Sequence, residues 1–280
     1  MAISALQINH EIIKRLSNKT EKSEAEAIAR ELWQHFHNWP AFDEEVPAQA
    51  MEHIFAALNR LEEGEPLQYI LEKAWFYGLE WKVNASVLVP RPETEELVHW
   101  VLSLENKGKK SVLDLGTGSG CIAVSLAKSG QWKSVSAVDI SPEALEIARY
   151  NAQKLGVQIE WVQQNILEEK PIVHPSRKWD IMVSNPPYVM LSESATMEKN
   201  VLDYEPHIAL FVPDRDPLVF YEKIAQAGLL QLEEGGSLFF EINPALGTET
   251  CLLLQKLGYT RVELRQDMFG KDRMVRAQKA

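Results

Sequence analysis

The stretch Val112-Leu113-Asp114-Leu115-Gly116-Thr117-Gly118-Ser119-Gly120 decides the fold class of this chain. Its first four residues form an apolar run with the character of a buried strand, and the glycines that follow permit a tight turn. A helical segment, Ile122–Lys128, comes directly after the turn. A strand, a glycine-rich turn and a helix in this order are typical of an α/β fold with a parallel sheet.

The same alternation continues toward the C-terminus. We expect further strands over 134–138, 159–162, 179–184, 237–242, 260–264 and 274–277, and helices over 92–102, 142–155, 218–232 and 245–257. No helical segment separates the last two strands, so one of them is predicted to run antiparallel to the rest.

The glycine-rich turn indicates a nucleoside-containing ligand at the carboxyl ends of the first two strands. The second strand ends in Asp139, about 20 residues further on, where a carboxylate reaches a ribose diol. The turn is G-x-G-x-G, unlike the G-x-G-x-x-G of dinucleotide enzymes, and the chain lacks the G-x-x-x-x-G-K-[ST] loop for a triphosphate. With Asp114 before it, the turn favours S-adenosylmethionine, and Ile140 and Ile166 are expected to flank its adenine.

The tetrad Asn185-Pro186-Pro187-Tyr188 follows the apolar strand 179–184. Two prolines stiffen the end of a strand, but this structural role leaves Asn185 and Tyr188 unexplained. A planar amino group needs two acceptors for its two N–H bonds and a face to lie against, which an Asn, a fixed carbonyl and an aromatic ring supply. We therefore predict that the tetrad binds a planar amino group. Residues 189–216 are expected to form a long loop that clasps the substrate.

Residues 1–73 are predicted to be helical. The segment Ser23-Glu24-Ala25-Glu26 has the pattern of a capping box that begins a second helix. Residues 74–90 alternate between apolar and polar side chains around Gly78, which is typical of a β-hairpin. Pro92 is well placed as the first residue of the next helix. We expect three parts: a helical substrate-recognition domain over 1–73, a hairpin linker over 74–90 and a catalytic domain over 91–280.

Composition narrows the class of protein. The chain has 280 residues and a net charge of −11, which argues against a protein that grips long nucleic acids by their phosphates. Cys121 and Cys251 are its only cysteines, so the sequence predicts neither a disulfide framework nor a metal site. The apolar runs are shorter than a membrane span and the N-terminus lacks the pattern of a signal peptide. A cytoplasmic enzyme without a membrane association is the expectation.

Blocks spread over nearly the whole chain, at 64–70, 76–78, 89–95, 114–120, 185–188 and 270–273, resemble those of one known family. This family is the bacterial protein-(glutamine-N5) methyltransferases that modify peptide chain release factors. The helical N-terminal region together with the block Val89-Pro90-Arg91-Pro92-Glu93-Thr94-Glu95 is the most specific part of this resemblance. The tetrad alone is shared with adenine-N6 methyltransferases.

The resemblance implies a Rossmann-like methyltransferase sheet of seven strands whose last pair is antiparallel. It also implies a reaction, in which the glutamine of the release factor's Gly-Gly-Gln loop is methylated, S-adenosylmethionine becomes S-adenosylhomocysteine, and no metal takes part. Asn185, Pro186 and Tyr188 would be catalytic, and with Pro187 they would hold the glutamine amide. The expected cofactor-binding residues are Gly116, Thr117, Gly118, Ser119, Gly120, Asp139, Ile140, Asn165, Ile166 and Asn185.

Two other functions remain open to the sequence. An adenine-N6 methyltransferase on DNA or RNA would bind the same planar amino group, but the acidic charge and the helical N-terminal region disfavour it. A protein that binds S-adenosylmethionine without chemistry is a second alternative, which the intact tetrad disfavours. Transfer of a labelled methyl group to a protein, to DNA or to neither separates the three functions.

Overall fold

The computed structural model describes residues 4–37, 45–103, 110–168 and 176–280. The chain divides into two compact units. The helical unit comprises Met1–Lys73 and Glu198–Tyr204, and the sheet unit comprises Ala74–Met197 and Glu205–Ala280. The chain therefore leaves the sheet unit after Met197 and returns to it at Glu205.

The helical unit is built from α1 (Ala5–Leu16), α2 (Lys22–Phe36), α3 (Ala48–Glu63), α4 (Leu67–Ile70) and α8 (Lys199–Tyr204). Its helices bury an apolar stripe, because side chains three and four residues apart share a helix face. The largest fully buried side chains of this core are Ile8, Ile12, Leu32, Trp33, Ile54 and Leu58. Gly64 ends α3 in a left-handed conformation with φ of 99°.

The predicted capping box at Ser23 is wrong. Helix α2 already begins at Lys22, its N-cap is Glu21, and none of the side chains that the structure describes caps it. Ser23 therefore lies inside the first turn of the helix. A capping box does form at α1, where the Ser4 amide donates to Gln7 Oε1 and the Gln7 amide donates to Ser4 Oγ. The same short pattern thus caps one helix and lies within the first turns of another.

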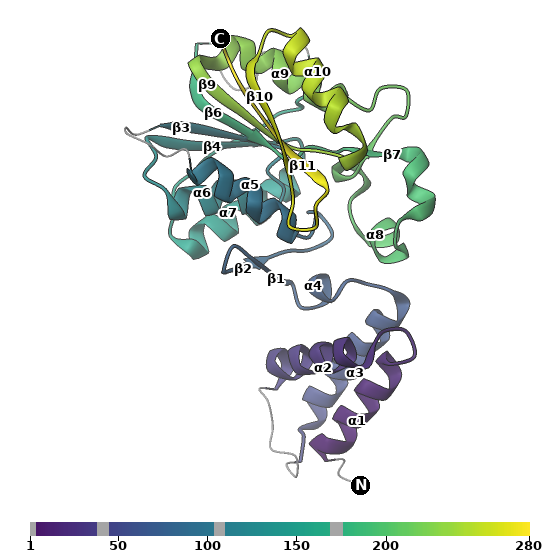
Figure 1. Ribbon diagram of the computed structural model, residues 1–280. Helices are drawn as coiled ribbons and strands as arrows, with labels where there is room; N and C mark the ends of the chain where they lie inside the picture. Colours follow the sequence, from purple (N-terminus) through teal and green to yellow (C-terminus); the bar gives the residue numbers. More distant parts are fainter. Residues whose placement is uncertain (1–3, 38–44, 104–109, 169–175) are drawn as a thin grey trace. The chain divides into compact units, whose positions relative to one another are not determined.

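The sheet unit contains a seven-stranded sheet with the order β10-β11-β9-β6-β3-β4-β5 (Figure 1). Its strands are β3 (Ser111–Leu115), β4 (Ser134–Asp139), β5 (Glu160–Gln163), β6 (Trp179–Ser184), β9 (Leu232–Glu241), β10 (Thr260–Gln266) and β11 (Asp272–Gln278). Five strands from β5 to β9 in this order run parallel, and β11 runs antiparallel to both β9 and β10. The predicted sheet with an antiparallel last pair is confirmed.

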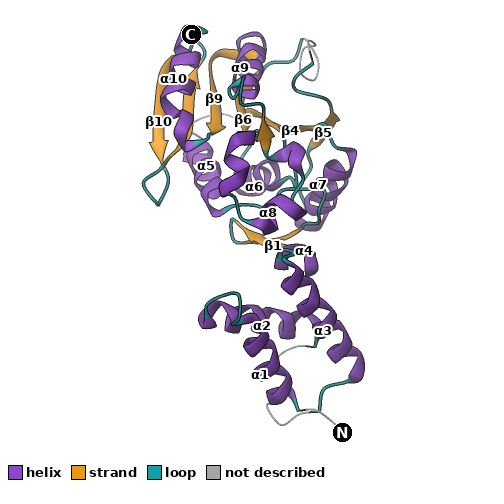
Figure 2. Ribbon diagram, turned by 90° about the vertical axis from the view of Figure 1, so that its right-hand side faces the viewer, coloured by secondary structure: helices purple, strands orange, loops and turns teal. Residues whose placement is uncertain are grey.

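Helices cover both faces of this sheet, which is why its central strands β3, β4 and β6 are buried over almost their whole length. Helices α5 (Pro92–Ser103), α6 (Cys121–Ser129) and α7 (Pro142–Leu155) lie on one face, and α9 (Val219–Gln231) and α10 (Gly247–Lys256) lie on the other (Figures 1 and 2). Two consecutive residues of β9 show this division. Phe239 contacts Trp100 of α5 edge to face, and Phe240 contacts Tyr221 of α9 in the same manner.

Two short strands, β1 (Lys73–Phe76) and β2 (Leu79–Lys82), form a small sheet of their own before α5. Tyr77 and Gly78 join them, both with positive φ, as a two-residue turn between strands requires. Helix α5 begins at Pro92, as predicted from the tolerance of first helical positions for proline. No helix within the described residues is long and apolar enough to cross a membrane.

The expectation of a long loop over 189–216 is corrected by the structure. This segment forms β7 (Val189–Met190), the 3-10 helices η1 (Leu191–Thr196) and η2 (His207–Ala209), α8, and β8 (Phe211–Val212). Strands β7 and β8 pair in parallel, and Glu205, Leu210 and Val212 are buried. The segment is folded because its own short elements satisfy its backbone groups. Its elements are too short to show a hydrophobic period in the sequence.

Candidate active site

Strand register places the candidate residues at one edge of the sheet. One row of paired residues crosses the four central strands at Val138, Leu115, Ser184 and Phe240. The residues that follow this row are Asp139, Gly116, Asn185 and Glu241. The strand order also reverses between β3 and β6, and ligands bind at the carboxyl ends of strands beside such a switch point.

Backbone hydrogen bonds to β4 fix the position of the glycine-rich turn after β3. The amides of Gly116 and Thr117 both donate to the carbonyl of Val138, at 2.9 and 3.0 Å. Gly116 and Gly118 have φ of 73° and 54°, and a Cβ on either residue would meet no atom within 4 Å. Gly120 differs, because a Cβ there would lie 3.1 Å from the Cβ of Ala148. The first two glycines thus leave space above the turn, whereas the third allows α6 to pack against α7.

Asp114, the last-but-one residue of β3, is fully buried beneath this turn. Its Oδ2 accepts hydrogen bonds from Thr117 Oγ1 at 2.6 Å and from the Ala123 amide at 3.2 Å. Its Oδ1 has no hydrogen-bond partner among the described residues. Burial raises the pKa of Asp114 to about 7, since the charged form is poorly solvated there.

Asp139 is held against the same turn. Its Oδ2 accepts from the Gly118 amide at 2.8 Å and its Oδ1 accepts from the Ser141 amide at 3.0 Å. Ser141 Oγ in turn accepts from the Ala144 amide and so caps α7. Burial raises the pKa of Asp139, although the two amide hydrogen bonds oppose this effect. The carboxylate is therefore fixed in direction beside the cavity that the glycines leave.

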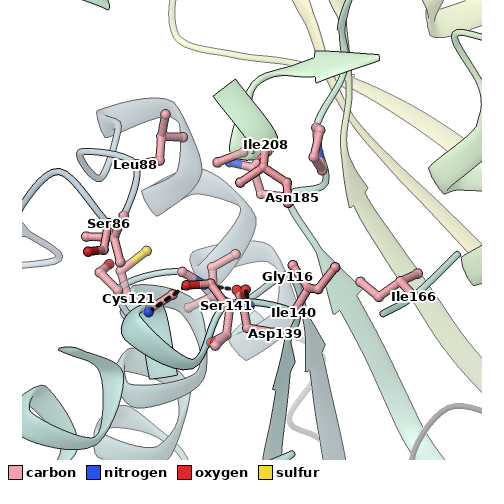
Figure 3. Close-up of a pocket in the computed structure, with 18 of the residues that line it drawn as sticks. Ser86, Leu88, Gly116, Cys121, Asp139, Ile140, Ser141, Ile166, Asn185 and Ile208 are labelled. Carbon is pink, nitrogen blue, oxygen red and sulfur yellow. Dashed lines mark hydrogen bonds between the residues drawn. The ribbon is translucent and has the colours of Figure 1, made fainter. Parts of the chain in front are cut away.

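A cavity of about 310 Å³ lies at these strand ends (Figure 3). Figure 3 shows Asp139 and Ile140 beside Gly116, with Asn185 and Ile208 across from them. The predicted residues that line the cavity are Gly116, Thr117, Gly118, Ser119, Asp139, Ile140, Asn165, Ile166, Asn185 and Pro187. The predicted residues Gly120, Pro186 and Tyr188 do not line it. Gly120 lies against α7, and Tyr188 packs on the core of the sheet unit.

Apolar side chains form one side of the cavity. Ile140 exposes 40% of its surface, which is unusual for a large aliphatic residue directly after a buried strand. Ile166, which is buried, lines the same cavity. Burial of Ile140 by a flat ring is favourable, because it removes apolar surface from water. These two residues therefore suit a purine.

The tetrad belongs to a buried hydrogen-bond network. Asn185 Nδ2 donates to Thr94 Oγ1 at 3.3 Å, and Thr94 Oγ1 donates to Glu241 Oε2 at 2.6 Å. The hydroxyl of Tyr188 donates to Glu241 Oε1 at 3.2 Å. Glu241 and Thr94 are both nearly inaccessible to solvent. One carboxylate thus connects the amide and the ring of the tetrad.

Glu241 sits between opposing electrostatic influences. Burial raises its pKa, whereas the hydroxyl of Thr94 and the positive charge of Arg273 favour the ionised form. Arg273 Nε donates to Asp267 Oδ2 at 3.0 Å, so its position beside the network is fixed. Burial also raises the pKa of Tyr188, which keeps its hydroxyl a donor.

Sequence reasoning assigned no role to several residues of this site. The network residues Thr94 and Glu241 are two of them, and the cavity is also lined by Ser86, Val87, Leu88, Arg91, Cys121, Ile208 and Phe220. Arg91 forms an ion pair with the buried carboxylate of Glu205, which also accepts from the Val89 amide at 3.3 Å. The position of Glu241 at the carboxyl end of a central strand was the available signal for its role.

Two family models match this chain. The Methyltransferase small domain matches residues 97–203, and the PrmC N-terminal domain matches residues 7–71. A solved structure of a methyltransferase from Pyrococcus furiosus has a similar fold, with a TM-score of 0.54 and 20% identity over 79% of this chain and 97% of that one. The matched family model and the similar fold thus place this chain in the methyltransferase class.

Curated relatives identify the family. A release factor glutamine methyltransferase of Flavobacterium psychrophilum is 46% identical over 78% of this chain and 77% of the relative. The protein of the same name from Bacteroides thetaiotaomicron is 48% identical, with the same two coverages of 78% and 77%. The chain belongs to the release factor glutamine methyltransferase family, and the resemblance stated from its sequence is confirmed.

Proposed function

We propose that this protein transfers the methyl group of S-adenosylmethionine to the side-chain amide nitrogen, N5, of the glutamine in the Gly-Gly-Gln loop of peptide chain release factors, and so modulates translation termination. The observation that carries the proposal is the position of Asn185, whose side-chain amide lines the cavity at the switch point of the sheet. Membership of the family supports release factors as the class of substrate.

The residues around the cavity fit S-adenosylmethionine. Gly116 and Gly118 leave open space where other residues would carry a Cβ, so a ligand can approach the backbone closely. Asp139 would accept hydrogen bonds from the ribose hydroxyls, and Ile140 and Ile166 would hold the adenine between them. The backbone and side chains of Thr117, Ser119, Asn165 and Asn185 would complete this site. When bound, S-adenosylmethionine supplies an electrophilic methyl group on a sulfonium centre.

The tetrad would activate the substrate amide by orienting it. An amide nitrogen is a poor nucleophile, because its lone pair is delocalised into the carbonyl. The Asn185 side-chain oxygen and the Pro186 carbonyl would accept hydrogen bonds from the two N–H groups of the substrate amide. Pro187 and the ring of Tyr188 would lie against the plane of that amide. Orientation and electrostatic stabilisation would supply most of the acceleration. Proton loss can follow the transfer, so no general base is needed before it.

The parts of the chain would divide the work. Residues 1–73 would recognise the release factor and residues 91–280 would catalyse the methyl transfer. Residues 74–90 would link these two domains. The folding units support this division with one addition, since Glu198–Tyr204 belongs to the helical unit. The hydroxyl of Tyr204 donates to the carbonyl of Glu63 at 3.3 Å within that unit. We place the reaction in the cytoplasm, where release factors act.

The charge of the cavity supports a glutamine of a protein, rather than an adenine of a nucleic acid, as the group that is methylated. Arg91 is the only Lys or Arg among the described residues that line it, and its charge is paired with Glu205. A site for a flipped base would need contacts to the flanking phosphates, which a chain with a net charge of −11 supplies poorly.

The test is transfer of labelled methyl from S-adenosylmethionine to a purified release factor. A factor with the loop glutamine changed to alanine and an adenine-rich DNA are the matched controls. Label on the wild-type factor alone is the expected result. Label on the DNA would favour an adenine methyltransferase, and bound cofactor without any transfer would indicate a binding protein.

A further inference from the structure

The proposed reaction requires that Oδ1 of Asn185, and not Nδ2, faces the substrate. Asn185 by itself does not determine which of the two atoms does so. The oxygen and nitrogen of an Asn amide are nearly equal in shape, and rotation by 180° about its last torsion exchanges them. With the oxygen toward the substrate, Asn185 accepts an N–H bond. With the nitrogen there, two N–H donors would face each other and no bond would form.

The network behind Asn185 has a defined direction of donation. Glu241 accepts at its two oxygens from the hydroxyls of Thr94 and Tyr188, at 2.6 and 3.2 Å, and the charge of Arg273 beside it favours the ionised carboxylate, which can only accept. Thr94 has a single hydroxyl proton, which this bond to Glu241 uses. The remaining lone pairs of Thr94 Oγ1 can only accept, so the group of Asn185 that faces Thr94 must be its NH₂.

The opposite atom, Asn185 Oδ1, accepts no hydrogen bond from the described residues. It is therefore left available on a residue that lines the cavity. Burial strengthens the constraint, since Thr94 and Glu241 expose 2% and 1% of their surfaces and water cannot replace either partner.

We propose that Thr94 and Glu241 are positioning residues that fix the Asn185 amide with its oxygen toward the amino group of a primary-amide substrate. The inference rests on the proposed function for the identity of that substrate. Glu241 also accepts a hydrogen bond from the hydroxyl of Tyr188. One carboxylate therefore orients both the Asn185 oxygen and the Tyr188 ring, the two groups proposed to contact the substrate amide. Neither residue touches the reacting atoms. Their effect passes through Asn185 and Tyr188.

Isosteric variants test the direction of donation. Thr94→Val keeps the shape but removes the hydroxyl, and Glu241→Gln keeps the shape but can present an NH₂ to Thr94. If the NH₂ introduced by Glu241→Gln donates to Thr94 Oγ1, the Thr94 hydroxyl proton is free to donate to Asn185 Oδ1. The Asn185 amide would then be turned by 180°, with its NH₂ toward the substrate. Thr94→Ser is the matched control, because it retains the hydroxyl and loses only a methyl group.

We expect Thr94→Val and Glu241→Gln to lower kcat for the release factor by about 10- to 100-fold, with the Kd for S-adenosylmethionine changed by about twofold or less. Thr94→Ser should retain kcat within about threefold of the wild type. Wild-type kcat in either of the first two variants would overturn the proposal, as would a Thr94→Ser variant as slow as Thr94→Val. If Glu241→Gln does not fold by circular dichroism, the two Thr94 variants decide the matter.

A second readout does not depend on activity. The side-chain ¹⁵NH₂ signals of Asn185, assigned by comparison with Asn185→Ser, report which atoms are hydrogen-bonded. We expect them to shift in Thr94→Val but not in Thr94→Ser, and unchanged signals in Thr94→Val would contradict the proposal. A wild-type enzyme that methylates no release factor would refute the proposed function, whereas these signals would still test the direction of the amide.

Discussion

Asn185 is the side chain on which the proposed reaction depends most directly. Truncation to alanine removes the oxygen that would accept an N–H bond of the substrate, but it leaves the glycine-rich turn and Asp139 in place. We expect Asn185→Ala to lower the rate of transfer by about 100-fold or more while the cofactor still binds. Single-turnover transfer and calorimetric titration with S-adenosylmethionine measure the two effects separately. An equal loss of both would contradict the amide-positioning role.

Asp139 is predicted to act on cofactor affinity. Its carboxylate would accept hydrogen bonds from the ribose, and its two amide hydrogen bonds hold it in position for this. We expect Asp139→Ala to raise the Kd for S-adenosylmethionine by about 10-fold or more, the cost of losing a charge-assisted hydrogen bond. Glu146→Ala is a control on α7, because Glu146 is exposed and does not line the cavity. An unchanged Kd in Asp139→Ala would rule out the ribose contact.

The buried Asp114 makes stability depend on pH. Its pKa is about 7 in the folded chain against an ordinary value of 3.8, so folding favours the protonated form. The stability that this group contributes is present below about pH 4 and is lost as the pH rises through about 7. Asp114→Asn stays neutral throughout. We therefore expect the stability of Asp114→Asn relative to the wild type to increase between pH 5 and pH 8, with each pH held in its own buffer.

Urea denaturation of both proteins at the two pH values measures this difference. The comparison between variant and wild type cancels the other titrating groups, which are common to both. A difference in stability that is the same at both pH values would show that Asp114 does not titrate in this range.

At the scale of the element, the three glycines of the turn have separable roles. Gly118→Ala places a methyl group in open space beside the cavity, whereas Gly120→Ala presses one against the backbone and Cβ of Ala148 at 3.3 and 3.1 Å. We expect Gly120→Ala to destabilise the protein by about 2–3 kcal/mol, through strain at positive φ and overpacking between α6 and α7. Gly118→Ala should cost about 1–2 kcal/mol, from the strain alone, but should weaken cofactor binding.

Thermal denaturation without ligand and titration with S-adenosylmethionine distinguish the two glycines. Each variant is the control for the other, because both change one glycine of the same turn to alanine. A Gly118→Ala variant that binds the cofactor as tightly as the wild type would show that the space above the turn is not used by it.

Helix α5 packs on strand β9 and carries Thr94 into the hydrogen-bond network of the site. Phe239 and Glu241 are two residues apart in β9 and therefore face the same side of the sheet, the side that α5 covers. Trp100 packs on Phe239, and Thr94, six residues before Trp100 in α5, is also buried. The packing of α5 on β9, to which this aromatic contact belongs, thus places Thr94 beside Glu241.

At the scale of the whole molecule, the helical unit is proposed to recognise the release factor outside its Gly-Gly-Gln loop. A short peptide that carries the loop would reach the tetrad but would lose contacts to that unit. We expect kcat/KM for the peptide to be lower than for the intact factor by about 100-fold or more, mainly through KM. Steady-state transfer to the two substrates measures this. Equal kcat/KM values would refute the recognition role of the helical unit.

Local patterns in the sequence predicted the order and type of the elements in the sheet unit. Buried strands, glycine turns and capped helices are decided by residues close in the chain, and the strand–helix alternation restricts the topology to few choices. Short signals were less reliable. The capping pattern at Ser23 lies inside a helix that begins at Lys22, and the segment 189–216 folds into elements too short to produce a period.

The sequence by itself determined the family and the parallel sheet with its antiparallel last pair. It also determined the glycine turn, Asp139 and the tetrad at the ends of β3, β4 and β6. Only the tertiary structure decided which side chains stand behind the tetrad. Thr94 is 91 residues from Asn185 and 147 from Glu241, and nothing in their spacing relates them. They meet because strand register aligns the ends of β6 and β9 while α5 packs across β9, and such contacts depend on the packing of distant elements rather than on local pattern.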